Sequence, residues 1–128
     1  MTYQYSIACR NAKLDAVETA IGVTAVLKIF SGAEPANCAA ADPTGPLVSM
    51  TLPSDWMNAA SAGAKTKLGA WSATASNTGT AASWRLYASD GTTCHVQGNM
   101  TDMILDNNSI ASGQVVTVNT FSITAGNA

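Results

Sequence analysis

A cysteine and the only histidine of the chain are neighbours, Cys94 and His95, in the segment TTCHVQG. A thiol beside an imidazole is the pairing that nucleophilic catalysis uses, with the histidine as the base that activates the sulfur. The segment is predicted to be a strand, however, and adjacent residues of a strand point to opposite faces of the sheet. Their side chains therefore cannot share a hydrogen bond, and we predict no catalytic residues and no enzymatic activity.

A second group of candidate ligands consists of Asp102, Asp106, Asn107 and Asn108. Their oxygen atoms suit a cation, but the spacing lacks the alternating ligands, central glycine and final glutamate of an EF-hand loop. Asp and Asn also form turns by hydrogen bonding to nearby backbone, which explains these residues without a metal. The sequence also has no phosphate loop, dinucleotide fingerprint or nucleophile elbow. We predict no metal site and no cofactor.

The three cysteines, Cys9, Cys38 and Cys94, cannot all pair within one chain, and their spacing is not that of a metal site. At least one of them is therefore a free thiol. All three are expected to serve as small apolar side chains in a reducing compartment. A bridge between Cys38 and Cys94 is the alternative.

Three tryptophans, Trp56, Trp71 and Trp84, are the other candidates for ligand binding, because exposed indole rings can stack on sugars. Trp84 shares the parity of Ala82 and Leu86 in an alternating segment, so it is predicted to lie in the core, and Trp71 is interpreted in the same way. Trp56 remains open as a surface residue for glycan binding.

The overall charge argues against several classes of partner. Charged residues make up 11% of the chain, against about 25% in an average soluble protein, so the surface is predicted to be mostly neutral. The net charge is −2 and the six Lys and Arg residues are scattered, which gives no basic patch for nucleic acid or an anionic membrane. No apolar run approaches the roughly 18 residues of a membrane span. The start MTYQYSIACR also lacks the features of a signal peptide, so synthesis in the cytoplasm is expected.

One helix is predicted near the N-terminus, over Arg10–Ile21. Leu14, Val17 and Ile21 recur at spacings of three and four, and Gly22 follows as a stop. Beyond this glycine the period changes to that of strands.

Strands are predicted at residues 26–31, 47–52, 67–72, 81–88, 93–98, 103–105 and 114–124. Asp90-Gly91 is a strong hairpin signal and should join two of them as an antiparallel pair. In the last strand the apolar parity changes at Asn119-Thr120, which indicates a β-bulge or a crossing between sheets. The stretch from Gly32 to Pro46, rich in Pro, Gly and Ala, is predicted to be a long loop.

About seven short strands without an alternating helix pattern predict an all-β fold, an antiparallel jelly-roll-like sandwich with one short N-terminal α-helix. The chain of 128 residues has the length of a single domain. Within it, residues 1–22 are predicted to form an N-terminal arm and helix, and residues 23–128 the β-sandwich.

Several stretches resemble a family of small virion structural proteins of tailed bacteriophages, the capsid cement or decoration proteins. The resemblance spans nearly the whole chain and consists of overall pattern and order, in RNAKLDAVETAIG, LKIFSG with PANCAAADPTG, LPSDWM, ASDGTTCHVQG and LDNNSIASGQVVTVNTFSITAGNA.

This resemblance implies a jelly-roll-like cement protein that binds the outer surface of the major capsid protein shell, bridges capsomers and stabilises the virion, with no catalytic residues. A homo-oligomer, either a dimer or a trimer, is expected. The predicted contact elements are Met1–Cys9, the helix Arg10–Ile21 and the loop Glu34–Pro46. The alternatives are a phage fibre or tail component, or a carbohydrate-binding module, that contacts host-surface glycans.

Overall fold

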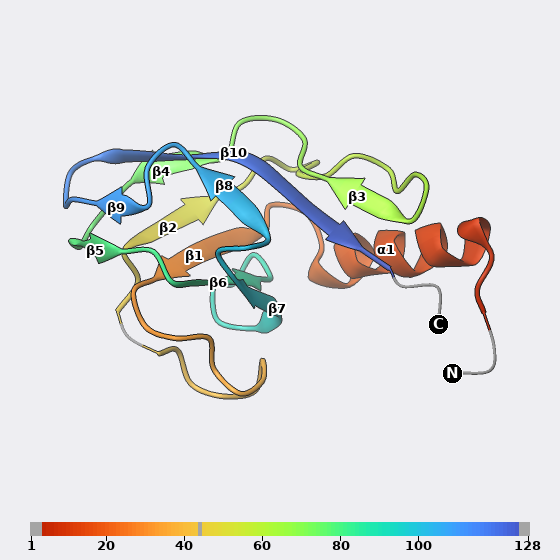
Figure 1. Cartoon of the computed structure of the whole chain (residues 1–128), viewed down its shortest axis with the longest axis horizontal. Coiled ribbons are helices and arrows are strands. Elements are labelled where there is room, and N and C mark those ends of the chain that lie inside the picture. The colour runs from red at the N-terminus through yellow and green to blue at the C-terminus, as the bar shows by residue number, and fades with distance from the viewer. Residues whose placement is uncertain (1–3, 44, 126–128) are drawn as a thin grey trace.

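The computed structural model describes residues 4–43 and 45–125, and it is mostly β-structure with one helix near the N-terminus (Figure 1). The all-β prediction with a short N-terminal helix is therefore confirmed. The elements are α1 (Ile7–Ile21), β1 (Val26–Phe30), β2 (Val48–Thr51), β3 (Ala64–Thr66), β4 (Ser72–Thr74), β5 (Gly79–Thr80), β6 (Ser83–Tyr87), β7 (Cys94–Asn99), β8 (Met103–Leu105), β9 (Ser109–Ile110) and β10 (Val115–Thr124).

The helix α1 begins earlier than the apolar spacing predicts. Ser6 caps it, because its hydroxyl oxygen accepts a hydrogen bond from the Cys9 N–H at 3.1 Å. At the other end Gly22 adopts a φ of 89° and donates its N–H to the Glu18 carbonyl at 2.9 Å. The boundary at Arg10 was thus wrong by one turn, because Ile7–Cys9 are exposed and add nothing to the apolar stripe on which the prediction depended. The predicted arm Met1–Cys9 accordingly ends in helix, and its first three residues lie outside the described residues.

The first sheet has the strand order β2-β1-β6-β7, and every neighbouring pair is antiparallel. The predicted hairpin at Asp90-Gly91 joins β6 to β7 and is confirmed. Its turn is held by the Asp90 carboxylate, which accepts hydrogen bonds from the N–H groups of Thr93 and Thr92, and these bonds lower the pKa of Asp90. Gly91 supplies the left-handed conformation of the turn with a φ of 72°.

The second sheet is organised by the long strand β10, which pairs antiparallel with β3, β4 and β8 along different parts of its length. Its register against β8 shifts between Val118 and Thr120, so the predicted β-bulge is confirmed. Because of that shift Val118 and Phe121 both face the core although they differ in parity. A further two-stranded ribbon, β5 with β9, was not predicted, since each strand has only two residues.

The hydrophobic core lies between these two sheets. The Trp84 ring meets the Phe121 ring edge to face, with 5.0 Å between centroids, and the Trp71 ring lies 5.3 Å from the same phenyl ring. Aliphatic side chains of both sheets fill the rest of the core, namely Leu27, Ile29, Val48, Met50, Leu86, Met103, Leu105, Val116 and Val118.

One local prediction between β2 and β4 was wrong. The strand expected over Lys67–Ser72 is not formed. β3 ends before Lys67 and β4 begins at Ser72, because Gly69 adopts a left-handed φ of 78° that interrupts the extended backbone. Lys67 itself forms an isolated antiparallel bridge with Met57.

Candidate functional site

The Cys94–His95 pair is separated by the sheet, as predicted. Cys94 is half-buried and packs against the cluster formed by Val26, Phe30 and Tyr87. His95 is exposed and lines a hollow beside α1 on the other side. The thiol and the imidazole therefore do not form a nucleophile–base pair.

The oxygen-rich segment after β8 uses its side chains to build a turn. The Asp106 carboxylate accepts from the N–H of Asn107 at 2.8 Å and from the N–H of Thr117 at 3.3 Å. The Asn107 side-chain carbonyl accepts from the Ser109 N–H at 3.0 Å. Asp102 lies apart from this turn, in a hollow beside β10. In residues 4–43 and 45–125 no three His, Cys, Asp or Glu side chains are grouped as metal ligands.

All three tryptophans are core residues, so none of them offers a ring face to a sugar. Trp56, which the sequence leaves open, is 0% exposed and donates its indole N–H to the Gly22 carbonyl at 2.9 Å, at the end of α1. Trp71 and Trp84 are buried as predicted.

The most connected polar group of the molecule is a clasp that the sequence analysis missed. It is centred on Arg85 in β6, which is only 2% exposed although it faces away from the core. One guanidinium nitrogen, Nη1, donates to Asp42 Oδ1 at 2.5 Å. The other, Nη2, donates to the carbonyls of Cys38 and Ala40 at 3.0 Å and of Asn37 at 3.2 Å. The loop between β1 and β2, hereafter the β1–β2 loop, is thereby held over the outer face of the first sheet.

Tyr87 completes this clasp. Its hydroxyl donates to the same Asp42 oxygen, and the Lys28 ammonium lies 4.7 Å from the centre of its ring. Burial and the neighbouring Asp42 carboxylate raise the pKa of Tyr87. Partial burial of Asp42 acts to raise its pKa, but the hydrogen bonds from Tyr87 and Arg85 outweigh this effect and lower the pKa. The carboxylate is therefore ionised at neutral pH. The arrangement fixes the β1–β2 loop against the sheet.

Two of the three cysteines lie on the face of the sheet that the clasp covers. The Cys38 carbonyl accepts from Arg85, Cys94 packs against Tyr87, and both thiols are half-buried and free. Cys9 lies apart from them, exposed on α1. All three cysteines are free thiols in the structure, so the alternative of a bridge between Cys38 and Cys94 is not formed.

A second polar cluster attaches α1 to the strands. Lys65 in β3 is 1% exposed, and its ammonium lies 2.8 Å from Asp15 and 2.9 Å from Glu18, one turn apart on the helix. It also donates to the Asn58 carbonyl at 2.8 Å. Burial opposes the charged form, but the two carboxylates outweigh it and raise the pKa of Lys65. Nearby, Arg10 donates to the Ala125 carbonyl at 2.9 Å.

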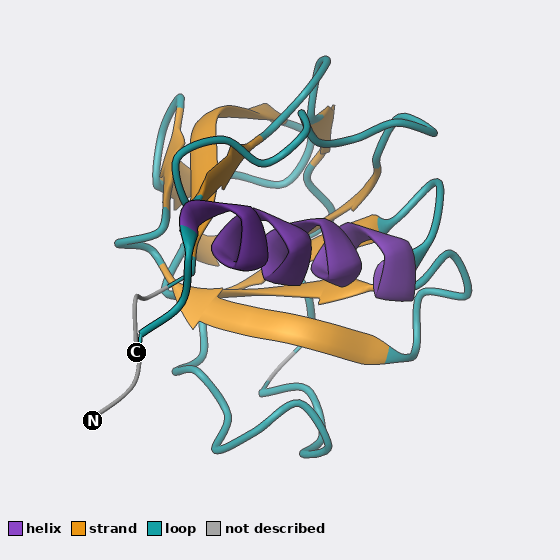
Figure 2. Ribbon diagram, turned by 90° about the vertical axis from the view of Figure 1, so that its right-hand side faces the viewer, coloured by secondary structure: helices purple, strands orange, loops and turns teal. Residues whose placement is uncertain are grey.

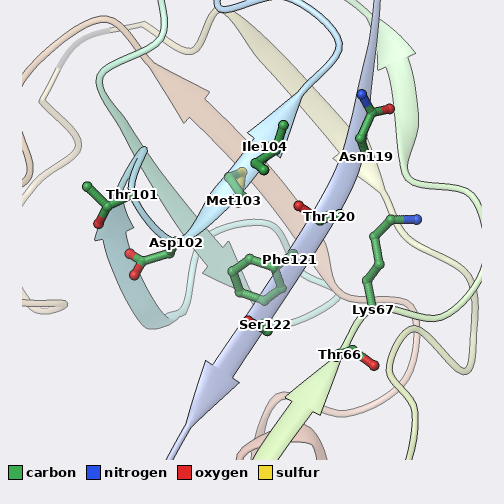
Figure 3. Close-up of a pocket in the computed structure, with 10 residues that line it drawn as sticks. All are labelled: Thr66, Lys67, Thr101, Asp102, Met103, Ile104, Asn119, Thr120, Phe121 and Ser122. Atoms are coloured by element: carbon green, nitrogen blue, oxygen red, sulfur yellow. The ribbon is translucent and has the colours of Figure 1, made fainter.

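A hollow with a volume of about 560 Å³ lies across β10 and is shown in Figure 3. Thr66 and Lys67 lie on one side of β10, and Thr101 and Asp102 on the other. Its floor includes the exposed side chain of Ile104. The hollow offers hydroxyl, ammonium and carboxylate groups but no exposed aromatic ring.

Within residues 4–43 and 45–125, these contacts engage every Lys and Arg side chain. Each of the six Lys and Arg side chains has a partner within the protein: a carboxylate for Lys65 and Arg85, a backbone carbonyl for Arg10, Lys28 and Lys67, and the Tyr5 ring for Lys13. The positive charges of this protein therefore hold its own fold together. What remains for the outer surface is mainly Ala, Ser, Thr and Asn.

Comparisons with models of protein families, with curated proteins and with solved structures found no match to this chain. In the part of the chain that the structure describes, no helix is long and apolar enough to cross a membrane.

Proposed function

We propose that this chain is a non-enzymatic structural protein of a tailed-phage particle, a cement or decoration protein that binds the outer surface of the major capsid protein shell and stabilises it. The resemblance of the sequence segments is the first support for this proposal. In the same proposal the two sheets form a jelly-roll-like sandwich, and the working form is a dimer or a trimer in the virion.

The observation that carries the proposal is the internal use of all six cations. A surface whose few Lys and Arg side chains are already engaged by other groups of the protein, and which carries mostly small neutral side chains, is poorly suited to bind phosphates or polyanions, which require clustered, exposed Lys and Arg. It suits close packing against protein neighbours, where the centre of an interface is depleted in charge.

The helix α1 supplies the contact face that we propose. Its exposed alanines, Ala8, Ala12, Ala16 and Ala20, recur every four residues and so share one side of the helix. Figure 2 shows α1 on the outside of the molecule, in front of the strands. Small side chains allow a neighbouring surface to approach the helix closely, and this increases the van der Waals contact between them.

The β1–β2 loop is the second proposed contact element. The clasp of Arg85 and Asp42 holds it against the sheet, so binding a neighbour costs little of the ordering entropy that a free loop would lose.

The first test is the number of copies of this protein relative to the major capsid protein in purified particles, measured by quantitative mass spectrometry. A ratio near one, or a simple fraction of it, supports a cement protein. A handful of copies supports a fibre or tail component, and absence from the particles refutes a virion protein.

A second test examines the contact face by co-sedimentation with capsid shells that lack this protein. Ala12→Glu places a bulky charge on the exposed side of α1, and it should weaken binding by at least about tenfold, or 1.4 kcal/mol. Ala111→Glu is the matched control, because Ala111 is also exposed but directly follows β9, which lies at the opposite end of the molecule from α1 (Figure 1). Equal binding by the two variants would exclude the alanine face of α1 as the contact.

Glycan binding by a fibre component or carbohydrate-binding module is the second candidate, and the hollow across β10 is the observation in its favour. Its Asp102 carboxylate and the hydroxyls of Thr66 and Thr120 are groups that hydrogen-bond sugars. A glycan array with the wild-type chain and Asp102→Ala tests this candidate, which requires binding that the substitution removes.

A further inference from the structure

We propose that the β1–β2 loop and the first sheet enclose a binding site for one water molecule, which bridges Arg85 Nε in β6 and Gln97 Oε1 in β7. The proposed site lies inside the clasp and does not depend on the function proposed above. Both atoms are buried, and neither has a hydrogen-bond partner among the described residues. A buried polar atom without a partner costs free energy, so native proteins pair nearly all such atoms with protein groups or with ordered water.

The two atoms belong to directly opposite residues of neighbouring strands. Arg85 pairs with Gln97 in the antiparallel register of β6 and β7, and both side chains bond to the β1–β2 loop that covers this face of the sheet. Side chains of directly opposite residues start about 5 Å apart at their Cβ atoms. One small molecule between the two side chains can therefore reach both the donor and the acceptor.

The orientation of the Gln97 amide is fixed by the loop. Its nitrogen, Nε2, donates to the Pro35 carbonyl at 2.6 Å. A carbonyl oxygen accepts hydrogen bonds and donates none, so exchanging the amide nitrogen and oxygen would place two acceptors against each other. The Pro35 contact thus fixes which amide atom is left without a partner, and that atom is the acceptor Oε1.

The Arg85 guanidinium is fixed in the same way. Nη1 donates to Asp42, and Nη2 donates to three carbonyls of the β1–β2 loop. Because the guanidinium is planar and rigid, these bonds also set the direction of the Nε–H group. Arg85 can turn Nε toward a new protein partner only by giving up contacts with the loop.

The chemistry of the two atoms selects the ligand. The Nε–H group is a donor and needs an acceptor, whereas Oε1 is an acceptor and needs a donor. A metal cation or an ammonium ion offers no acceptor to Nε–H, and a simple anion such as chloride offers no donor to Oε1. A neutral hydroxyl compound does both, and water is the smallest of these. It accepts from Arg85 and donates to Gln97.

This water joins the two attachments of the loop. Pro35 is held through Gln97, and the segment that contains Cys38 and Asp42 is held through Arg85. The bridge connects both attachments into one hydrogen-bond network. Because the loop covers the site, the water exchanges with solvent only when the loop opens locally, and it should remain bound much longer than water on the surface.

Two measurements on the full chain test the site. In a high-resolution crystal structure, one ordered water should lie about 2.7–3.2 Å from both Arg85 Nε and Gln97 Oε1. In solution, the Hε proton of Arg85 should give a cross-peak to water with opposite signs in NOE and ROE spectra, which identifies a long-lived water in contact with this proton. A direct bond between Arg85 Nε and Gln97 Oε1 in the crystal structure, or no ordered water between them, would overturn the proposal.

A pair of variants tests whether Gln97 holds the water. Gln97→Met keeps the length of the side chain but removes the acceptor, so the cross-peak between water and Arg85 Hε should be lost. Gln114→Met is the matched control, because the Gln114 side chain accepts from the Ala111 N–H at 3.1 Å before β10, and it should leave the cross-peak unchanged. An unchanged cross-peak in Gln97→Met would refute a bridge to Gln97. If Gln97→Met does not fold, the two measurements on the wild type decide.

Discussion

Replacing Gly98 by alanine should destabilise the core, because the added methyl group has no room. A Cβ atom at this position of β7 would lie 2.6 Å from Cζ2 and 2.8 Å from Cε2 of Trp84, inside the contact distance of carbon atoms. It would also lie 2.3 Å from Asp102 Oδ2, but that carboxylate is exposed and can turn away. The indole cannot, because it is 2% exposed and its N–H donates to the Asn99 carbonyl at 2.8 Å.

The size of the effect follows from the site. Overpacking a well-filled core by a methylene or methyl group typically costs about 1–3 kcal/mol, and we take about 2 kcal/mol here because one rigid ring must move. With 128 residues and about 2.1 cal/mol/K of unfolding entropy per residue, that cost lowers the melting temperature by about 7 °C.

Thermal denaturation of Gly98→Ala followed by circular dichroism measures this shift. Gly45→Ala is the matched control, since its nearest neighbour would be Asn77 Nδ2 at 3.9 Å, and it should leave the melting temperature unchanged or slightly raised. Trp84→Phe removes the ring atoms that clash, so the double variant should be more stable than the sum of the single effects by about 1 kcal/mol. A Gly98→Ala protein that melts within 2 °C of the wild type, or strictly additive effects, would refute the steric argument.

Two further predictions concern the polar clusters. Lys65→Met should lower the free energy of unfolding by about 2 kcal/mol and speed hydrogen exchange in α1, because it removes the ion pairs to Asp15 and Glu18 and the hydrogen bond to the Asn58 carbonyl, while both carboxylates keep some contact with solvent. Lys67→Met loses only a hydrogen bond to the Gly69 carbonyl, so it should change the urea midpoint little. The lowered pKa of Asp42 means that its ionised form stabilises the fold above the usual pKa near 4, and that this contribution is lost as the pH falls through the lowered value. In melting curves recorded from pH 7 to pH 2, the difference in melting temperature between the wild type and Asp42→Asn should therefore become smaller below about pH 4. A difference in melting temperature that stays constant over this range would contradict the role of the Asp42 charge.

Local patterns in the sequence predicted much of the fold. The alternation of Leu47–Leu52 is observed in β2, where Val48 and Met50 are buried and Ser49 and Thr51 are exposed. The Asp90-Gly91 turn and the parity change in β10 were equally informative. All of these signals come from residues within a few positions of one another, where backbone preference and side-chain alternation decide the conformation.

The clasp could not be predicted in this way. The alternation of β6 places Ser83, Arg85 and Tyr87 on one face of the sheet. From the sequence this face is expected to be exposed to solvent, because antiparallel sheets commonly have one solvated face. The tertiary structure buries that face as well, under a loop whose Asp42 is 43 positions from Arg85. Nothing in the local pattern indicates that a Pro- and Ala-rich loop will return over the sheet.

The sequence by itself determined the strand periodicity, the hairpin, the bulge, the single helix and the scarcity of charge, because each depends on neighbouring residues or on composition. The tertiary structure alone decided that Trp56 is buried, and that Lys65 and Arg85 lie in the interior with their carboxylates. The physical reason is that a buried charge is tolerable only beside its partner, and that a tryptophan is buried only where other elements pack over it. Both conditions join residues that are far apart in the chain and meet only when it folds.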